Sequence, residues 1–335
     1  MAIIEVENVR KEFKIAKRET GFAGALKSIV NRQFETKAAV NDISFSIEKG
    51  EMVGYIGPNG AGKSTTIKML TGILVPSSGS IRINGIIPYE NRKENAKNIG
   101  VVFGQRTQLW WDLPTIESFE LLKEIYRVSD ARYKENMETF SDILGLGEFL
   151  NTPVRQLSLG QRMRADIAAS LLHDPDILFL DEPTIGLDVV AKEKMREFIQ
   201  EINKLRNVTV ILTTHDMEDI EKLCKRMVLI DHGQKVYDGE IAAVKSRYGK
   251  MRTLIVDVEE NGVDLQVSNG EICKVEGNRK WIRFNRDDYS ASDVISQITQ
   301  THNITDLTVE EPEIESIISR IYQEGFTREE VPVKV

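Results

Sequence analysis

The chain has 335 residues, 41% of them hydrophobic and 29% charged, which suits one large globular domain with a smaller second one. Its net charge of −8 argues against a general nucleic-acid binder, and no apolar run approaches the roughly 18 residues that a membrane-spanning helix needs. Cys224 and Cys273 are the only cysteines and lie far apart, so they suggest neither a disulfide framework nor a metal site and fit a reducing cytosol. Because no apolar run is long enough to span a membrane, any membrane role must come through a partner.

The first predicted elements are strands. Residues 3–9 alternate in part and predict an edge strand, and residues 39–47 return to a strand pattern. Between them, about residues 17–36 form an insert with apolar positions at helical spacing. Residues 10–37 hold eight Lys or Arg against three Glu, a local charge of +5. A contact with a membrane surface and a helix packed on the sheet edge both remain open for this insert.

Residues 57–65 match the phosphate-loop pattern G-x-x-x-x-G-K-[ST] and follow the apolar stretch 52–56. A strand, a glycine-rich turn and a helix bring backbone N–H groups and a positive helix end to a phosphate. Lys63 would reach the β- and γ-phosphates, and the Ser64 hydroxyl would ligate Mg²⁺. The motif predicts a nucleoside triphosphate as ligand, held by Gly57, Pro58, Asn59, Gly60, Ala61, Gly62, Lys63, Ser64 and Thr65.

The elements that follow predict an α/β core interrupted by helices. Residues 63–74 read as a helix and residues 80–85 as a strand closed by a turn. Residues 115–150 are rich in helical pattern. Residues 177–180 and 208–214 are continuous apolar runs, which indicate strands buried on both faces of a parallel sheet.

Two acids follow the apolar run at 177–180. A strand buried on both faces cannot hold carboxylates, so Asp181 and Glu182 must emerge at its carboxyl end, where open parallel sheets bind ligands. Asp181 would hold Mg²⁺, and Glu182 would polarise the attacking water as general base. The alternative is a solvated Asp-Glu turn before Pro183, which the phosphate loop upstream makes a minor one.

Two more polar residues stand at element ends. Ser158, in Leu-Ser-Leu-Gly-Gln before a helix, suits an N-cap and can present its hydroxyl and the following N–H groups to a phosphate. His215 follows the strand at 208–214, where it can hydrogen-bond a γ-phosphate. An ordinary Ser-x-Gly turn and a structural histidine are the alternatives.

In this order the motifs resemble the ATP-binding subunit of ABC transporters. The family's sequence of motifs is Walker A 57–65, Q-loop Gln105, signature 157–161, Walker B 177–182, D-loop 186–188 and switch His215. The resemblance covers about residues 1–240. It implies an α/β fold: a P-loop NTPase core with a RecA-like, mainly parallel sheet and an antiparallel β edge, plus a helical signature subdomain at about 106–170.

The resemblance also implies an ATPase that binds ATP and Mg²⁺ between two copies of itself, arranged head to tail. Ser158, Gly160 and Gln161 of one copy then meet the nucleotide of the other, and Asp188 couples the two sites. Gln105 senses Mg²⁺ and the γ-phosphate, and Phe13 stacks on adenine, although a core Phe is an alternative there. The chain departs from the family pattern at Leu159, usually Gly, and at Phe13, usually Tyr.

Residues 241–335 predict a small α+β accessory domain. Short strands are expected at about 253–258, 272–275 and 281–284, and helices at about 291–301 and 313–325. Residues 306–321 resemble the C-terminal extension of ABC-2-type ATPases, the drug, lipid and polysaccharide exporters. That resemblance implies an integral-membrane permease as partner, no nucleic acid, and a peripheral location on the cytoplasmic face of the membrane. Trp110 and Trp111, just after the Q-loop, are candidate docking residues for the permease, with packing of at least one Trp in the core as the alternative. The insert is a further candidate for this contact. The alternative function is a soluble ABC-type ATPase with a regulatory or translation-related role and no permease.

Overall fold

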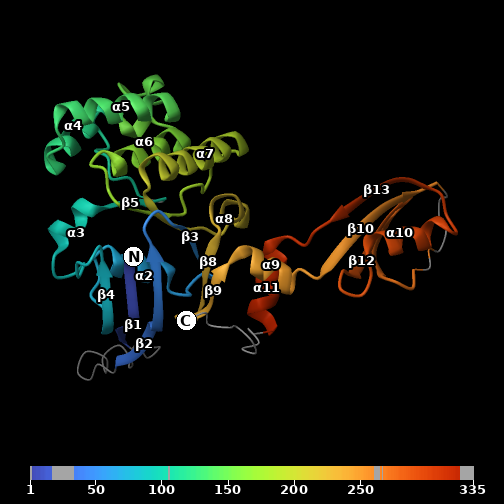
Figure 1. Ribbon diagram of the computed structural model, residues 1–335. Helices are drawn as coiled ribbons and strands as arrows, with labels where there is room; N and C mark the ends of the chain where they lie inside the picture. Colours follow the sequence, from blue (N-terminus) through green and yellow to red (C-terminus); the bar gives the residue numbers. More distant parts are fainter. Residues whose placement is uncertain (1, 17–33, 105, 260–264, 266, 325–335) are drawn as a thin grey trace, which may run out of the picture. The chain divides into compact units, whose positions relative to one another are not determined.

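The computed structural model describes residues 2–16, 34–104, 106–259, 265 and 267–324 (Figure 1). The chain divides into two compact units, Met1–Gly239 and Glu240–Val335. Among the described residues, no helix combines the length and apolarity needed to cross a bilayer.

The first unit is built on a six-stranded sheet of order β5-β6-β7-β3-β8-β9. The first five strands in this order, β5, β6, β7, β3 and β8, each pair in parallel with their neighbours among them. The strands are β3 (Met52–Ile56), β5 (Ile99–Phe103), β6 (Ile177–Asp181), β7 (Thr209–Thr213), β8 (Arg226–Asp231) and β9 (Gln234–Glu240). The apolar runs at β6 and β7 are buried almost throughout, as expected for strands covered on both faces. The predicted α/β fold with a mainly parallel sheet is confirmed.

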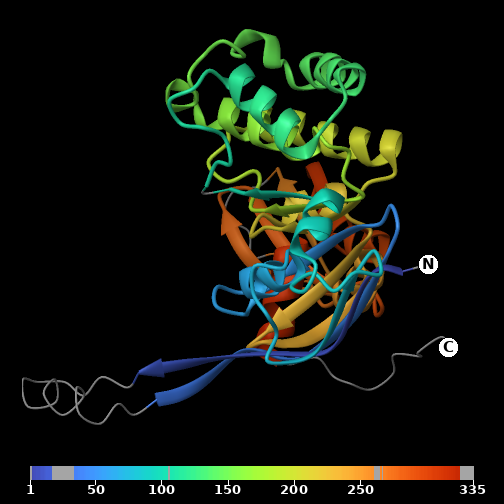
Figure 2. The same cartoon turned by 90° about the vertical axis from the view of Figure 1, so that its left-hand side faces the viewer.

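A second, three-stranded antiparallel sheet joins β1 (Ala2–Ala16), β2 (Phe34–Glu48) and β4 (Ser78–Ile83) in the order β2-β1-β4. The predicted edge position of residues 3–9 is wrong, because β1 pairs with β2 on one side and β4 on the other. The far parts of β1 and β2 form a projecting arm (Figure 2). Residues 34–36 of the predicted insert belong to strand β2, and residues 17–33 lie outside the described part of the chain.

One hydrophobic core joins the two sheets and helix α2 (Lys63–Leu70). Ile4 and Phe45 of the antiparallel sheet share it with Tyr55 and Phe179 of the parallel sheet. The helix ends four residues before the predicted boundary. Gly72 follows it with φ +78°, and a Cβ there would lie 2.6 Å from the carbonyl oxygen of Pro88, so the chain turns away at this point.

The helices between β5 and β6 lie together, apart from the antiparallel sheet (Figures 1 and 2). Ser129 caps α5 by accepting a hydrogen bond from the backbone N–H of Arg132, and Gly145 ends the helix in the left-handed region. The segments are α4 (Thr115–Tyr126), α5 (Asp130–Leu144), η1 (Leu146–Glu148), η2 (Val154–Gln156) and α6 (Leu159–Leu171). The other helices of this unit are α3 (Arg92–Asn98), α7 (Val189–Arg206) and α8 (Met217–Leu223).

The second unit contains a four-stranded antiparallel sheet of order β11-β12-β10-β13. Val294 and Ile298 of α10 (Ala291–Thr299) pack on it with Leu254, Ile282 and Phe284. The strands are β10 (Met251–Val258), β11 (Glu271–Glu276), β12 (Arg279–Asn285) and β13 (Ile304–Glu310), of which the sequence analysis missed β13 because most of its side chains are exposed. Helix α9 (Ile241–Tyr248) contacts α11 (Ile314–Glu324).

Candidate nucleotide-binding site

A cavity of about 780 Å³ lies where the phosphate loop meets the carboxyl end of β6. Lys63 and Ser64 line it together with the acids Asp181 and Glu182, and Phe13 contributes an aromatic wall from β1. Cavities of a few hundred cubic ångströms and more are typical of small-molecule and cofactor sites. The fold therefore brings together residues that are separated by more than a hundred positions in the chain.

The loop between β3 and α2 has little room for side chains. A Cβ on Gly57 would lie 2.5 Å from the carbonyl oxygen of Ile230, and one on Gly62 would lie 2.5 Å from that of Ala39. Gly62 also has φ +108° and is the N-cap of α2, where it offers no side-chain acceptor. The first N–H groups of α2 thus have no side-chain cap and are available to an anion.

The Lys63 ammonium lies inside this loop. Its Nζ donates to the carbonyl oxygen of Gly57 at 2.6 Å and approaches that of Pro58 at 3.3 Å. Burial lowers the pKa of Lys63, and the negative charges of Glu182 and Asp181 oppose this effect. A polyphosphate in the cavity would add further negative charge close to this ammonium group.

The two acids at the carboxyl end of β6, Asp181 and Glu182, are held by the neighbouring strands. The Thr213 hydroxyl donates to Asp181 Oδ1, and the Glu182 N–H donates to the Thr213 carbonyl at 2.8 Å. Gly104 approaches so closely that a Cβ there would lie 2.4 Å from the Glu182 carbonyl oxygen. Glu182 has φ +55°, an uncommon conformation for a side-chain-bearing residue that is enriched at functional sites.

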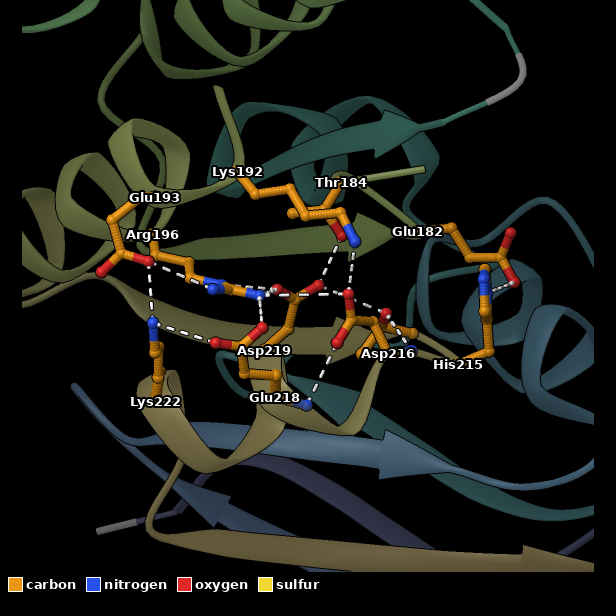
Figure 3. A network of polar contacts seen from close by, with 11 residues as sticks. Glu182, Thr184, Lys192, Glu193, Arg196, His215, Asp216, Glu218, Asp219 and Lys222 are labelled. Atoms are coloured by element: carbon orange, nitrogen blue, oxygen red, sulfur yellow. Dashed lines mark hydrogen bonds and ion pairs between the residues drawn. The ribbon is translucent and has the colours of Figure 1, made fainter. Parts of the chain in front are cut away.

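His215, the predicted switch histidine, lies beside the second acid. His215 Nδ1 lies 3.4 Å from Glu182 Oε1, and the His215 side chain is 67% exposed (Figure 3). The two residues follow β6 and β7, which are neighbours in the parallel sheet, so their side chains meet at the same edge. The structure thus brings His215 next to Glu182, although His215 is not among the residues that line the cavity.

Next to this pair, a polar network joins Thr184, Arg196 of α7 and Asp219 of α8, which the sequence did not predict. Asp219 of α8 accepts hydrogen bonds from the Thr184 hydroxyl and from Arg196 Nε, the latter at 2.7 Å (Figure 3). The side chains of Arg196 and Asp219 are almost fully buried. The only signal in the sequence was an acid four positions after His215, which by itself indicates nothing about its partners.

The signature and D-loop residues have local partners. Ser158 and Gln161 form a reciprocal capping box at the start of α6, with bonds of 2.9 and 3.2 Å. Asp188 caps α7 by accepting from the Ala191 N–H at 2.8 Å. Ser158, Gly160, Gln161 and Asp188 are not among the residues that line the cavity.

Gln105 lies outside the described residues, so its predicted roles remain predictions. Its neighbour Arg106 lines the cavity, as do Lys68 of α2 and Ala39 of β2, none of which the motif analysis singled out. Arg106 and Lys68 add positive charge, which favours an anionic ligand. Of the phosphate-loop residues, Asn59, Gly60, Gly62, Lys63, Ser64 and Thr65 line the cavity.

This fold and site define a P-loop ATPase, and comparison with known proteins agrees. A family model described as "ABC transporter" matches residues 40–185. The chain is 36% identical over 227 residues to the ABC transporter ATP-binding protein NatA of Bacillus subtilis, covering 67% of this chain and 91% of that protein. It is 34% identical to the linearmycin resistance ATP-binding protein LnrL of the same organism, over 66% of this chain and 70% of that protein.

A solved structure extends the similarity to the fold. The dimeric, post-hydrolysis structure of the ATP-binding cassette MJ0796 with ADP and Pi has a TM-score of 0.59 and 27% identity, covering 71% of this chain and 98% of that one. The chain belongs to the ATP-binding proteins of ABC transporters. It is an ATP-hydrolysing subunit of such a transporter, and the resemblance drawn from its motifs is confirmed at this level.

Proposed function

We propose that this subunit works as a head-to-tail homodimer, closed by Mg²⁺ and ATP, that drives an ABC-2-type export permease. The observation that carries the proposal is the division of the phosphate-binding groups within one copy. The cavity holds the phosphate loop and the acids, whereas Ser158 and Gly160 of the signature are not part of its lining. A second copy facing the cavity would supply the missing donors, and the γ-phosphate would then link the two surfaces.

Each of the proposed site residues has a distinct task. Glu182 accepts a proton from the attacking water, and His215, 3.4 Å from its carboxylate, orients the γ-phosphate beside it. Lys63 neutralises charge on the β- and γ-phosphates. Gln105 reports the state of the phosphate to the partner subunit, and Asp188 links the two sites of the dimer.

Ser64 and Asp181 fit the magnesium ion that this chemistry requires. Both offer oxygen atoms, which Mg²⁺ prefers, and both line the cavity. The Thr213 hydroxyl already donates to Asp181 Oδ1, so it holds the carboxylate in one orientation. When bound, the ion would neutralise charge that develops on the phosphate oxygens.

Phe13 is the proposed adenine-stacking residue. Its ring lines the cavity, is 37% exposed and has Lys11 Nζ 5.3 Å from its centre. An aromatic face that is partly open to solvent can stack on a base without a change in the core.

The proposed membrane partner docks beside the Q-loop at the cytoplasmic face of the membrane. Trp110 and Trp111 are 39% and 50% exposed, and exposed aromatic residues are enriched at protein interfaces. Export is favoured by the ABC-2-like residues 306–321 and by the name of the relative LnrL, which links that protein to linearmycin resistance.

The oligomeric state of a hydrolysis-deficient variant tests this proposal. Glu182→Gln should be monomeric without nucleotide and dimeric at saturating Mg²⁺ and ATP, measured by light scattering after size exclusion. Lys63→Ala in the same background should stay monomeric, because it removes the phosphate contact. A Glu182→Gln protein that remains monomeric at saturating nucleotide, alone and with its membrane partner, would overturn the proposal. Co-purification with ribosomes instead of an integral membrane protein would favour the soluble alternative.

A further inference from the structure

Helix α6 carries a buried acid that the proposed mechanism does not use. Asp166 is 4% exposed and lies two turns after the signature residue Ser158. Its Oδ1 accepts hydrogen bonds from the Thr107 hydroxyl at 2.8 Å and from the Gln108 N–H at 3.1 Å. The acid therefore contacts a segment 58 and 59 positions earlier in the chain.

One more hydrogen bond joins these residues to α6, and another lies within the segment itself. Gln108 Nε2 donates to the backbone carbonyl of Asp166 at 2.9 Å, and the Leu109 N–H donates to the Thr107 hydroxyl at 3.1 Å. Residues 107–109, which we call the 107–109 segment, are thus bonded to α6 through Thr107 and Gln108, by both side-chain and main-chain atoms. Such a connection resists relative movement better than a single contact would.

The 107–109 segment lies between two parts of the chain with proposed roles. Gln105, two residues before it, is the proposed sensor of the γ-phosphate. Trp110 and Trp111, directly after it, are the proposed docking residues. Helix α6, to which the segment is bonded, begins at the Ser158 capping box of the signature.

The chemistry of Asp166 argues against a role in packing alone. Burial raises the pKa of Asp166 to about 6, an effect that its hydrogen bonds from Thr107 and Gln108 and the charge of Arg162 only partly offset. A buried carboxylate is an expensive residue, and an apolar side chain would fill the space at lower cost. What an apolar side chain could not do is accept the two hydrogen bonds.

We propose that Asp166 is a positioning residue that makes the 107–109 segment and the signature helix α6 move as one body. A displacement at Gln105 or at the tryptophans is then passed through the 107–109 segment and α6 to Ser158. A displacement at Ser158 is passed in the opposite direction along the same route. This inference rests on the proposed dimeric function, because the position of Ser158 matters only where it meets the nucleotide of a second copy.

The test uses the full chain in the Glu182→Gln background and measures the Mg²⁺-ATP concentration at which half of the protein is dimeric. Asp166→Ala should raise that concentration about tenfold, a common size for a coupling between sites. Asp166→Asn should stay close to the parent, because its amide oxygen can still accept from Thr107 and Gln108. Thr107→Val removes the hydroxyl that donates to Asp166 and accepts from the Leu109 N–H, at nearly constant volume, and leaves the bond from the Gln108 N–H to Asp166 in place. Its midpoint should fall between the two.

A matched control separates coupling from simple loss of stability. Ser170→Ala removes a buried hydroxyl of α6 that, among the described residues, bonds only to the carbonyl of Ile167 in its own helix. It should leave the dimerisation midpoint unchanged, whatever it does to the melting temperature. Binding of a fluorescent ADP analogue to the monomer should be the same in all variants, because the phosphate loop is untouched.

Three results would overturn the inference. The first is that Asp166→Ala dimerises at the parental nucleotide concentration. The others are that Asp166→Asn, or the control Ser170→Ala, raises the dimerisation midpoint as far as Asp166→Ala does. If Asp166→Ala does not fold, an unchanged midpoint in Thr107→Val overturns it equally. Failure of the parent Glu182→Gln protein to dimerise contradicts the proposed function instead, so the two failures are distinguishable.

Discussion

Arg196 of α7 and Asp219 of α8 form a buried ion pair, with Arg196 Nε 2.7 Å from Asp219 Oδ1 (Figure 3). The same carboxylate accepts a hydrogen bond from the Thr184 hydroxyl, two residues after Glu182. It also accepts one from the hydroxyl of Thr214, the residue before His215, with 3.4 Å between Thr214 Oγ1 and Asp219 Oδ2. One ion pair therefore holds the backbones that carry the proposed general base and the switch histidine.

Asp219→Ala should lower the free energy of unfolding by about 3–5 kcal/mol, because breaking a buried pair leaves an uncompensated charge. Urea denaturation monitored by circular dichroism measures the loss. Lys222→Ala removes a more exposed member of the same network and should change stability little. A loss for Asp219→Ala no greater than that of Lys222→Ala would show that the pair does not hold this region together.

Glu182→Gln should reduce kcat for ATP hydrolysis by about a hundredfold to ten-thousandfold, the range usual for loss of a general base. Nucleotide affinity should be retained, because the phosphate loop is unchanged. Phosphate release and equilibrium binding of ATP measure the two quantities separately. Turnover within a few-fold of the parent would mean that another group accepts the proton.

Gly62→Ala should destabilise the protein more than Gly60→Ala does, measured as melting temperature without nucleotide. Both glycines have positive φ, so both variants have backbone strain of about 1–2 kcal/mol. Only at Gly62 would the new Cβ also meet a backbone atom, the Ala39 carbonyl oxygen at 2.5 Å, whereas nothing lies within 4 Å at Gly60. Equal losses in the two variants would contradict the close approach of the loop to β2.

The stability of Asp166→Asn relative to the parent should depend on pH. Because the Asp166 pKa is raised to about 6 from 3.8, the folded chain keeps a proton that the unfolded chain releases between these values. The parent therefore loses stability as pH rises through that window, by up to about 3 kcal/mol, and the variant avoids this loss. Urea denaturation at pH 4 and pH 7.5 measures the free energy of unfolding of both proteins. The value for the variant relative to the parent should be higher at pH 7.5 than at pH 4. A pH-independent difference would mean that burial does not disfavour the Asp166 carboxylate.

Local patterns predicted the parts of this fold that depend on neighbouring residues. Gly57 and Gly62 match the tight approaches of the loop, and Ser158 is indeed an N-cap, because a cap depends on residues three positions away. The placement of Asp181 and Glu182 at a strand end also followed from the apolar run before them. The roles assigned to these residues in ATP hydrolysis stay predictions.

What the sequence by itself determined, then, are the phosphate loop, the buried parallel strands and the acids that follow them, since each is encoded within a few consecutive residues. Only the tertiary structure decided that β1 lies between β2 and β4, that Asp219 faces Arg196, and that Asp166 accepts bonds from Thr107 and Gln108. An alternating pattern shows which face of a strand is buried but not which strands flank it. A polar residue likewise shows that it needs a partner, while the packing of distant elements selects which one.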